Sequence, residues 1–392
     1  MYYPTFLTLA IDFNTMRYEF RLAELLGHTP DRRKRPGTIK AIVDYTGLDR
    51  HQVASLLKNE AKYIPLEALS RLCDYLVEHG YARADELPGA LFAVKPEHFW
   101  ELLARRRRLE ICVGVRRPDG DDTPETAWVV ASDAVLMGEV LNGVTTLGGT
   151  DKLARSQNSN VRELPTHPET LKQTLVWSPG NVETTEAIAR ARYVYDEFTS
   201  SSGDKALICL GSVKSNPVVE MILADTFQAV PFESQDKVAK ASERRCPFFL
   251  RYRDHDPHPS CASAGMRLSK DFDAKEAGIY YEQADGSWAF AGGQDTALVF
   301  YIYRESLGRL EMVLSGFSGR ATRLLARTLA NRSEAFWPPV YQANYLQIGA
   351  YIVQYEAIES EAEPYDILRT DVIGNPIVTP LSAEVIERRL RG

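Results

Sequence analysis

The chain has 392 residues, of which 44% are apolar and 25% charged, and its formal net charge is −7. This length predicts two or three domains, and the composition is that of a globular protein with a sizeable core. No run of about 18 apolar residues occurs, so a membrane-spanning helix is not expected. Five scattered cysteines without a C-x-x-C pair favour reduced thiols, and the chain start lacks the basic stretch of a signal peptide. We therefore expect a cytoplasmic protein.

The first informative stretch predicts two short helices joined by a tight turn, after an amphipathic helix expected over residues 16–26. Apolar residues recur at helical spacing between Ile39 and Val43 and again between Val53 and Leu57. Gly47 lies between them and can adopt the left-handed backbone conformation of a turn. Asp49 is placed to cap the second helix through its carboxylate. A third helix is expected over residues 66–77.

With its apolar positions turned inward, the second helix presents short polar side chains of the kind that read base edges in a major groove. Residues 36–81 resemble the Cro/C1-type (lambda-repressor-like) helix-turn-helix family. The resemblance implies a positioning helix over residues 38–46 and a recognition helix over residues 50–59. Val43 stands where the family usually has a small residue, so the helix packing must accommodate two extra methyl groups. The alternative is a helical hairpin that merely ends in glycine.

The partner implied by this resemblance is double-stranded DNA. Residues 31–62 carry eight Lys or Arg against four Asp or Glu, whereas the whole chain is acidic. A local basic patch can collect phosphate contacts, although residues 32–35 alone could equally be a solvated loop. The residues expected to contact DNA are Arg33, Arg35, Thr38, Arg50, His51, Gln52, Ser55, Lys58, Asn59 and Lys62.

The rest of the chain is expected to form an α/β layer. We predict a helical DNA-binding domain over residues 1–104, and a connecting segment with strands and a helix over residues 105–180. Within that segment, residues 148–174 resemble a long surface connection. From residue 181 the order strand, glycine turn and helix occurs twice, with strands at 206–210 and 310–314 and helices at 218–227 and 321–329. Such repeats favour a mostly parallel sheet, so residues 181–392 are expected to form a Rossmann-like α/β domain. The predicted fold class is α + α/β.

Both glycine turns follow strands, which is where open α/β sheets bind ligands. Backbone N–H groups at the following helix starts favour a small anionic ligand, such as a nucleotide or a phosphorylated metabolite. G-S-x-x-S-N-P resembles the phosphate-holding loops of Rossmann-like nucleotide and flavin binders, but neither turn has a full dinucleotide or P-loop motif, so no cofactor is expected. The alternative is that the glycines only make tight turns. The expected ligand-binding residues are Gly211, Ser212, Lys214, Ser215, Asn216, Gly316, Ser318, Gly319 and Arg320.

No catalytic residue and no metal site is assigned. The stretch G-F-S-G-R at residues 316–320 differs from a nucleophile elbow because Arg320 stands at the second glycine position. The loop at residues 253–261 gathers possible metal ligands, but its spacing matches no zinc motif.

Two functions are therefore compatible with the sequence. In the first, the protein is a DNA-binding transcriptional regulator whose α/β domain senses the anionic ligand. In the second, the α/β domain is a nucleotide-acting enzyme or a phage-defence effector with a DNA-binding module. The lack of a convincing nucleophile or general base favours the first, and a purely structural DNA-associated protein is a third possibility. A homodimer on a palindromic site is expected, because one recognition helix contacts few base pairs.

Overall fold

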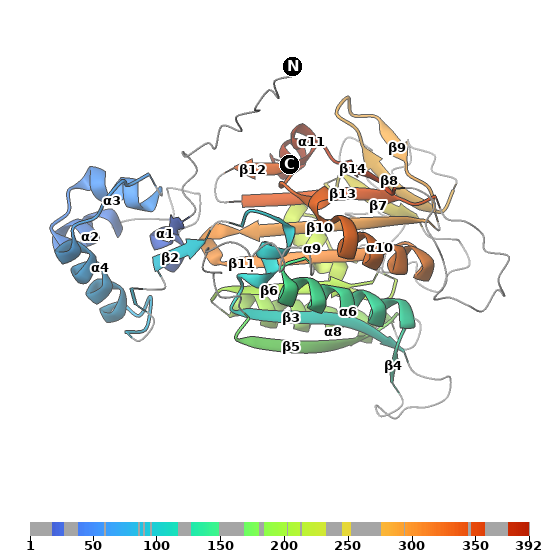
Figure 1. Ribbon diagram of the computed structural model, residues 1–392, viewed down its shortest axis with the longest axis horizontal. Coiled ribbons are helices and arrows are strands. Elements are labelled where there is room, and N and C mark those ends of the chain that lie inside the picture. Colours follow the sequence, from blue (N-terminus) through green and yellow to red (C-terminus); the bar gives the residue numbers. More distant parts are fainter. Residues whose placement is uncertain are drawn as a thin grey trace, which may run out of the picture. The chain divides into compact units, whose positions relative to one another are not determined.

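The computed structural model describes residues 18–26, 38–58, 60–84, 87–88, 91–94, 96–116, 127–148, 168–179, 184–201, 203–211, 214–232, 245–251, 276–293, 295–343, 346–356 and 375–391. The chain divides into two compact units, Met1–Pro96 and Glu97–Gly392. Figure 1 labels the elements of both units.

The first unit combines helices with a two-stranded sheet. Its helices are α1 (Leu22–Leu25), α2 (Thr38–Thr46), α3 (Arg50–Leu57) and α4 (Leu66–Glu78). Strand β1 (Tyr18–Phe20) pairs antiparallel with β2 (Phe92–Val94). The single helix expected over residues 16–26 is thus wrong, because the backbone around residue 20 bonds to a strand from the end of the unit.

The core of this unit follows from the helical spacing of its apolar residues. Ile42 of α2, Val53 of α3 and Leu72 of α4 have no exposed surface and belong to one cluster of buried side chains. Burying a side chain of this size contributes about 1.5–3 kcal/mol relative to leaving it exposed. The three helices predicted from the sequence are confirmed, and their packing onto one another is what fixes the turn between α2 and α3.

The second unit is built on a nine-stranded sheet. Its strands run in the order β12-β13-β10-β11-β6-β3-β4, with β14 paired to β13 and β5 paired to β3. They are β3 (Arg108–Arg116), β4 (Trp128–Val129), β5 (Thr170–Trp177), β6 (Lys205–Leu210), β10 (Thr296–Arg304), β11 (Arg309–Gly316), β12 (Tyr341–Ala343), β13 (Leu346–Gln354) and β14 (Ile377–Pro380).

This sheet is mixed rather than mostly parallel. Strands β11, β6, β3 and β5 are parallel neighbours. Strands β10, β12, β13 and β14 pair antiparallel, as does the short β4. The predicted parallel layer is therefore confirmed only for the half of the sheet that contains the two strand–glycine–helix repeats. The antiparallel half follows because β10 and β11 are joined by a short turn, which permits only antiparallel pairing.

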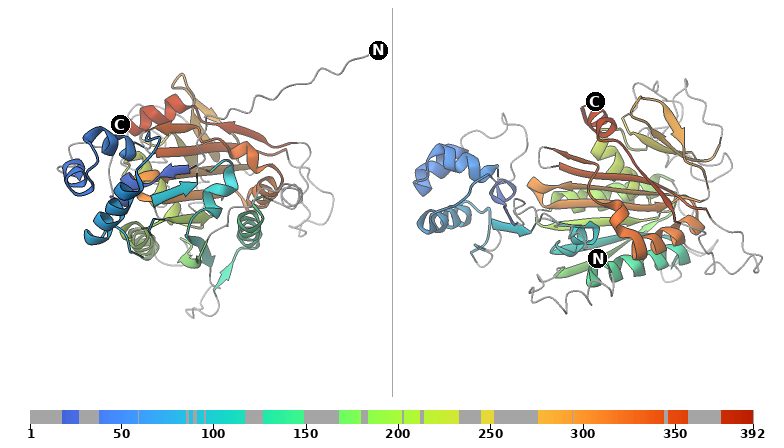
Figure 2. Two further views of the ribbon diagram at one scale, coloured as in Figure 1. Left: turned by 60° about the vertical axis from the view of Figure 1, so that its left-hand side comes forward. Right: turned by 45° about the horizontal axis from the view of Figure 1, so that its top comes forward.

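Helices cover both faces of the sheet. Helices α5 (Phe99–Ala104), α6 (Ala131–Thr146) and α10 (Gly319–Arg332) pack on one face, and α8 (Thr184–Ser200) and α9 (Val218–Phe227) pack on the other. Figure 2 shows α6 and α10 on the opposite side of the sheet from α9. In β6, Leu207 and Cys209 belong to one buried cluster while Ile208 and Leu210 belong to the other. Burial on both faces explains why this strand is a continuous apolar run in the sequence.

A smaller sheet and the last helix complete the unit. Strands β7 (Phe248–Arg251), β8 (Gly278–Glu282) and β9 (Trp288–Phe290) form an antiparallel sheet. Helix α11 (Ala383–Arg391) is joined to it by an ion pair in which Arg389 Nε lies 2.6 Å from Glu282 Oε2.

The division into domains differs from the one expected. Phe99 and Trp100 of α5 are fully buried in the core of the second unit, although the sequence placed residues 97–104 with the DNA-binding domain. Residues 105–180, expected to connect two domains, supply β3, β4, α6 and β5 to the sheet. Strand β3 lies between β5 and β6, so this segment belongs to the unit's core.

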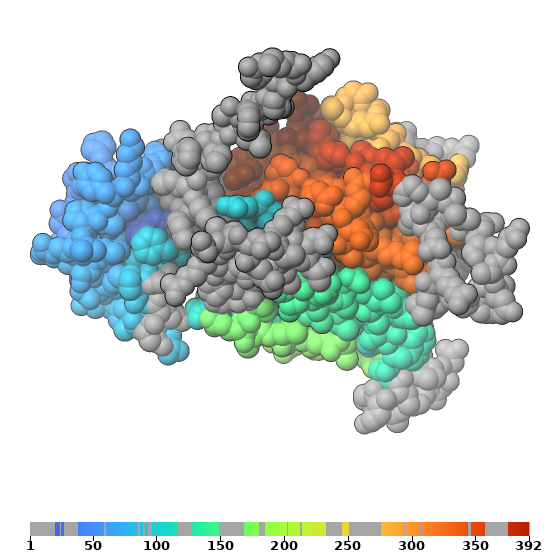
Figure 3. All heavy atoms as spheres, in the orientation of Figure 1, coloured from blue at the N-terminus to red at the C-terminus, as the bar shows by residue number. Residues whose placement is uncertain are grey.

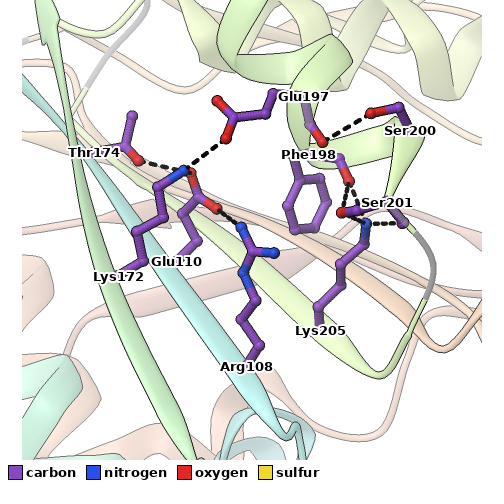
Figure 4. Close-up of polar contacts among 9 residues, drawn as sticks. All are labelled: Arg108, Glu110, Lys172, Thr174, Glu197, Phe198, Ser200, Ser201 and Lys205. Carbon is purple, nitrogen blue, oxygen red and sulfur yellow. Dashed lines mark hydrogen bonds and ion pairs between the residues drawn. The ribbon is translucent and has the colours of Figure 1, made fainter.

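Charged side chains fill the layer between α8 and the amino ends of the parallel strands (Figure 4). The buried carboxylate of Glu110 on β3 accepts a hydrogen bond from Thr174 Oγ1 at 2.6 Å and pairs with Arg108 at 2.9 Å. Lys172 of β5 lies 3.3 Å from the same carboxylate and 3.2 Å from Glu197 of α8. These contacts hold α8 against β3 and β5.

Lys205, at the start of β6, likewise holds the end of α8 against the sheet. Its Nζ donates to the carbonyl oxygens of Phe198 and Ser201 and, at 2.7 Å, to Ser201 Oγ. Burial, together with the neighbouring guanidinium groups of Arg309 and Arg108, lowers the pKa of Lys205 to about 8. The amino end of the parallel layer is thus occupied by structural ion pairs and hydrogen bonds.

Candidate functional site

The turn between α2 and α3 has the geometry expected of a helix-turn-helix. Gly47 has a φ of +75°, in the region that favours glycine. Asp49 Oδ1 accepts hydrogen bonds from the backbone N–H groups of His51 at 2.7 Å and Gln52 at 2.8 Å. Gln52 Oε1 in turn accepts from the N–H of Asp49 at 3.0 Å, which completes a capping box. The predicted cap is confirmed, and it fixes where α3 begins.

Most of the residues expected at the DNA lie on accessible surface. Arg50, His51, Lys58 and Lys62 are exposed. Thr38, Gln52 and Ser55 are half-buried. Arg33, Arg35 and Asn59 lie outside the described residues. Lys58 also approaches Glu60, with 3.9 Å between Nζ and Oε2. Exposure is compatible with DNA contact, and the individual roles remain predictions.

Gln52 has a special position among these residues. Its side-chain oxygen is held by the capping box, so the amide group is fixed in orientation. The two N–H groups of that amide remain the part able to donate to a ligand. In the major groove they suit acceptors such as the N7 and O6 atoms of guanine, the N7 atom of adenine or the O4 atom of thymine.

The second candidate site lies where the parallel strands end. Strands β6 and β11 are parallel neighbours, and the N–H of Gly211 donates to the carbonyl oxygen of Leu314 at 3.0 Å. Gly211 and Gly316 therefore lie at the same edge of the sheet, as the sequence suggested. Gly211 has a φ of +88°, and a Cβ there would lie 2.4 Å from Ser215 Oγ. A Cβ at Gly316 would lie 2.2 Å from the backbone nitrogen of Thr322. Close packing thus requires both glycines, with or without a ligand.

Several of the predicted ligand-binding residues already have structural partners. Asn216 has no exposed surface, and its Nδ2 donates to the carbonyl oxygens of Cys112 at 2.9 Å and Leu210 at 3.2 Å. Its Oδ1 accepts from the N–H of Val218 at 3.2 Å, near the start of α9. Asn216 therefore ties together β3, β6 and α9. Lys214 is half-buried, Ser215 is buried, and Ser212 lies outside the described residues.

The residues after β11 are likewise engaged. Ser318 is the N-cap of α10, where its Oγ accepts from the N–H of Ala321 at 3.1 Å. This role accounts for a serine at that position without a nucleophile. Arg320 Nε donates to Asp295 Oδ1 at 2.6 Å, in a pair whose side chains are each 29% exposed. Gly319 is exposed.

Sequence reasoning assigned no site residue to the start of α6. Asp133 is buried, and its Oδ2 lies 3.1 Å from where a Cβ on Gly211 would stand. Ser132 Oγ lies 3.5 Å from the corresponding position at Gly319. Burial raises the pKa of Asp133 to about 6, although the hydroxyl of Ser132 and the charge of Arg116 oppose the shift. We call Ser132, Asp133, Gly211, Ser215 and Gly319 the strand-end cluster. The only signal in the sequence was a Ser-Asp pair at a helix start.

Comparison with known proteins identifies the first site. The family described as Cro/C1-type HTH DNA-binding domain matches residues 32–77. This segment, which includes α2, α3 and most of α4, is therefore a helix-turn-helix DNA-binding domain. No curated protein and no solved structure matches the chain.

Two further observations concern the described residues alone. None of their helices has the length and apolar character needed to cross a membrane. They also contain no group of three or more His, Cys, Asp or Glu side chains arranged to hold a metal ion. The possible ligands at residues 253–261 lie outside the described part of the chain.

Proposed function

We propose that the protein is a transcriptional regulator that binds a specific duplex DNA sequence through α3. The observation that carries this proposal is the capped α3 after the Gly47 turn, in a segment that matches a DNA-binding family. Exposed Arg50 and His51 and the oriented amide of Gln52 supply groups for base edges. Lys58 and Lys62 supply charge for phosphates.

Selection of bound duplexes from a random pool, followed by titration of the enriched sequence, tests this function. We expect binding to the selected duplex to exceed binding to a scrambled duplex by at least about 10³-fold at physiological salt. The same affinity for both duplexes would reject sequence-specific regulation.

We also propose that the second unit acts as a Rossmann-like sensor of a small anionic ligand at the strand-end cluster. The support is that two glycine turns and the starts of α6 and α10 meet at one sheet edge. Helix starts favour anions, while Asp133 supplies a hydrogen-bond acceptor. A nucleotide satisfies both, because it combines phosphate with hydroxyl and amino donors.

Thermal unfolding with a panel of nucleotides and phosphorylated metabolites tests the sensor. A true ligand at a hundredfold excess over its Kd should stabilise the protein by about 2.7 kcal/mol. Arg320→Gln should reduce this gain, and Arg323→Gln, a change three residues along the same helix, serves as the control. If no compound of either class stabilises the protein, this second part of the proposal fails.

A nucleotide-acting enzyme is the second candidate, and Asp133 is the observation that favours it. A carboxyl group with a pKa of about 6 can accept and donate a proton near neutral pH. Chromatography of nucleotides incubated with the protein separates the two functions, because a sensor leaves them intact. Asp133→Asn should abolish any turnover that depends on this group.

A further inference from the structure

We propose that a second copy of this chain docks on the outer edge of β5 and the exposed side of α6, so that the nine-stranded sheet continues across a twofold axis. We call this area the β5–α6 surface and define it by Gly138, Leu171, Gln173 and Leu175. Figure 1 shows β5 at one end of the sheet, and Figure 3 shows α6 and β5 side by side on one face of the molecule. The proposal identifies the surface through which two copies would form the homodimer that is expected for DNA recognition.

Strand β5 offers an unpaired edge. All eight of its residues pair with β3 on one side. In the described part of the chain, no strand pairs with its other side. Such an edge presents backbone N–H and C=O groups ready to bind another strand, and proteins that stay monomeric usually protect it.

The usual means of protection is missing from the described part of this edge. A lysine can shield an edge when its side chain projects over it. Lys172 instead lies within 3.3 Å of Glu110 and 3.2 Å of Glu197, on the side of the sheet that faces α8 (Figure 4). On the opposite face, Leu171 is 55% exposed and Leu175 is 45% exposed. The edge therefore carries two exposed leucines where a monomer would place charge.

Helix α6 extends this apolar area. Gln173 Nε2 lies 3.8 Å from Met137 Sδ, which places β5 beside α6. Helix α10 packs against α6 as well, but on the side away from β5 (Figure 1). The exposed residues of α6 include no charged side chain; they are Ala131, Ala134, Val135, Gly138, Asn142 and Thr145.

Gly138 gives an independent indication that something approaches this helix closely. Glycine in the middle of a helix is less stable than alanine. At Gly143 the chain itself explains the glycine, because a Cβ there would lie 2.3 Å from the ring of Trp100. A Cβ at Gly138 would meet nothing within 4 Å. A glycine at position 138 is explained if α6 of a second copy packs against α6 at short range, because a side chain there would prevent the close approach.

The sequence of β5 is complementary to itself. Residues opposite each other in an antiparallel pair point to the same face. When two copies of β5 pair about a twofold axis at Gln173, Leu171 stands opposite the partner subunit's Leu175, and the reverse pair forms on the other side of the axis. Both leucine pairs then lie on the face that carries α6. A shift of the axis to residue 172 would place Leu175 opposite the partner subunit's Glu169. This self-complementarity is why we assign the surface to a second copy and not to an unrelated protein.

The oligomeric state of the full chain tests the proposal. We expect the wild-type protein to sediment as a dimer at micromolar concentration without DNA. The double variant Leu171→Glu/Leu175→Glu should sediment as a monomer, with the dissociation constant raised at least a hundredfold. Leu307→Glu is the matched control, because Leu307 is a leucine of the same unit with 41% exposure and lies outside the β5–α6 surface. Circular dichroism and the melting temperature establish that each variant folds.

A monomeric wild-type protein, or a folded double variant that remains a dimer, would overturn the proposal. The inference builds on the homodimer expected from the sequence and does not depend on DNA binding. Affinity for a single half-site should be the same for the double variant and the wild type. If the dimer interface were assigned wrongly, half-site binding would be unaffected. If the DNA-binding function were assigned wrongly, neither protein would bind the half-site, so the two failures can be told apart.

A cysteine on the proposed axis tests the register. Gln173→Cys should form a disulfide between two copies under mild oxidation, because residues opposite each other have Cβ atoms about 4.5–5.5 Å apart. Gln342→Cys is the control, since Gln342 is an exposed glutamine on β12 at the other end of the same sheet. The wild-type protein with its native cysteines gives the baseline. A dimer in which Gln173→Cys cross-links no better than Gln342→Cys would refute the paired edge.

Discussion

The capping box at the start of α3 allows helix stability and base recognition to be separated by mutation. Asp49 accepts two backbone hydrogen bonds, at 2.7 and 2.8 Å, and Gln52 returns one, at 3.0 Å. Asp49→Ala removes the cap and should lower the free energy of unfolding by about 1 kcal/mol, within a range of about 0.5–2 kcal/mol. A folded domain several kcal/mol more stable than its unfolded state loses almost no folded population from such a change. The affinity of Asp49→Ala for DNA should therefore stay close to that of the wild type.

Gln52→Ala should behave differently. It removes one reciprocal hydrogen bond and also the amide donors available to bases. We expect a loss of about 1–3 kcal/mol on the specific duplex, or roughly five- to 150-fold in affinity, with a much smaller loss on random DNA. Lys62→Ala, in contrast, should weaken binding to both duplexes equally and reduce the salt dependence by about one phosphate contact.

Fluorescence anisotropy at fixed salt, with the selected and a scrambled duplex, measures both affinities for each variant, and thermal melting measures stability. The assignment of roles is refuted if Gln52→Ala loses specific and random binding in equal proportion. It is also refuted if Asp49→Ala, still folded, loses as much discrimination as Gln52→Ala, because the helix cap would then account for the whole effect.

Three further predictions concern the strand-end cluster and the neighbouring Asn216. Burial raises the pKa of Asp133 from an ordinary 3.8 to about 6, so the folded state binds this proton more tightly than the unfolded state does. As the pH rises from 5 to 7.5 the proton is lost, and the free energy of unfolding of the wild type should fall relative to that of Asp133→Asn by on the order of 1 kcal/mol, measured by urea titration. Gly211→Ala should destabilise the protein more than Gly286→Ala does. The two glycines have similar φ angles, +88° and +86°, but only at Gly211 would an added Cβ meet other atoms within 4 Å. Asn216→Ala should lower the free energy of unfolding by at least about 2 kcal/mol, because the carbonyl groups of Cys112 and Leu210 lose their hydrogen-bond donor. A smaller loss of stability in thermal melts would contradict the bridging role of Asn216.

Local patterns determined how much could be predicted. The bounds of α2 and α9 were predicted to the residue, those of α2 from the resemblance to a helix-turn-helix and those of α9 from the local pattern of strand, glycine turn and helix. The Asp49 cap lies three residues from its partner. The resemblance to a DNA-binding family was confirmed for the same reason, since the helix-turn-helix is a short continuous segment.

Elements that depend on distant partners were missed. Residues 170–174 of strand β5 lie in a stretch interpreted as a surface connection, because Thr170, Lys172 and Thr174 interrupt the apolar pattern of the strand. Lys172 and Thr174 are satisfied by Glu110, about sixty residues earlier in the chain, and Lys172 also by Glu197. The relative direction of neighbouring strands could not be predicted from the sequence either. A strand buried on both faces has the same apolar run whether its neighbour is parallel, as β6 is to β11, or antiparallel, as β10 is.

The proposed ligand site depends in the same way on contacts between distant residues, and these contacts affect which ligand fits. The sequence correctly brought Gly211 and Gly316 to one edge, because both follow strands of one parallel layer. It could not show that Asn216 bonds to Cys112 or that Arg320 pairs with Asp295, and these contacts leave fewer hydrogen-bond donors for an anion than expected. It also missed the buried carboxyl of Asp133 beside Gly211. A bare phosphate would meet this carboxyl group as a like charge above pH 6. A nucleoside phosphate can turn a hydroxyl or amino donor toward Asp133 and its phosphate toward the start of α10, so it fits the observed groups better than inorganic phosphate does.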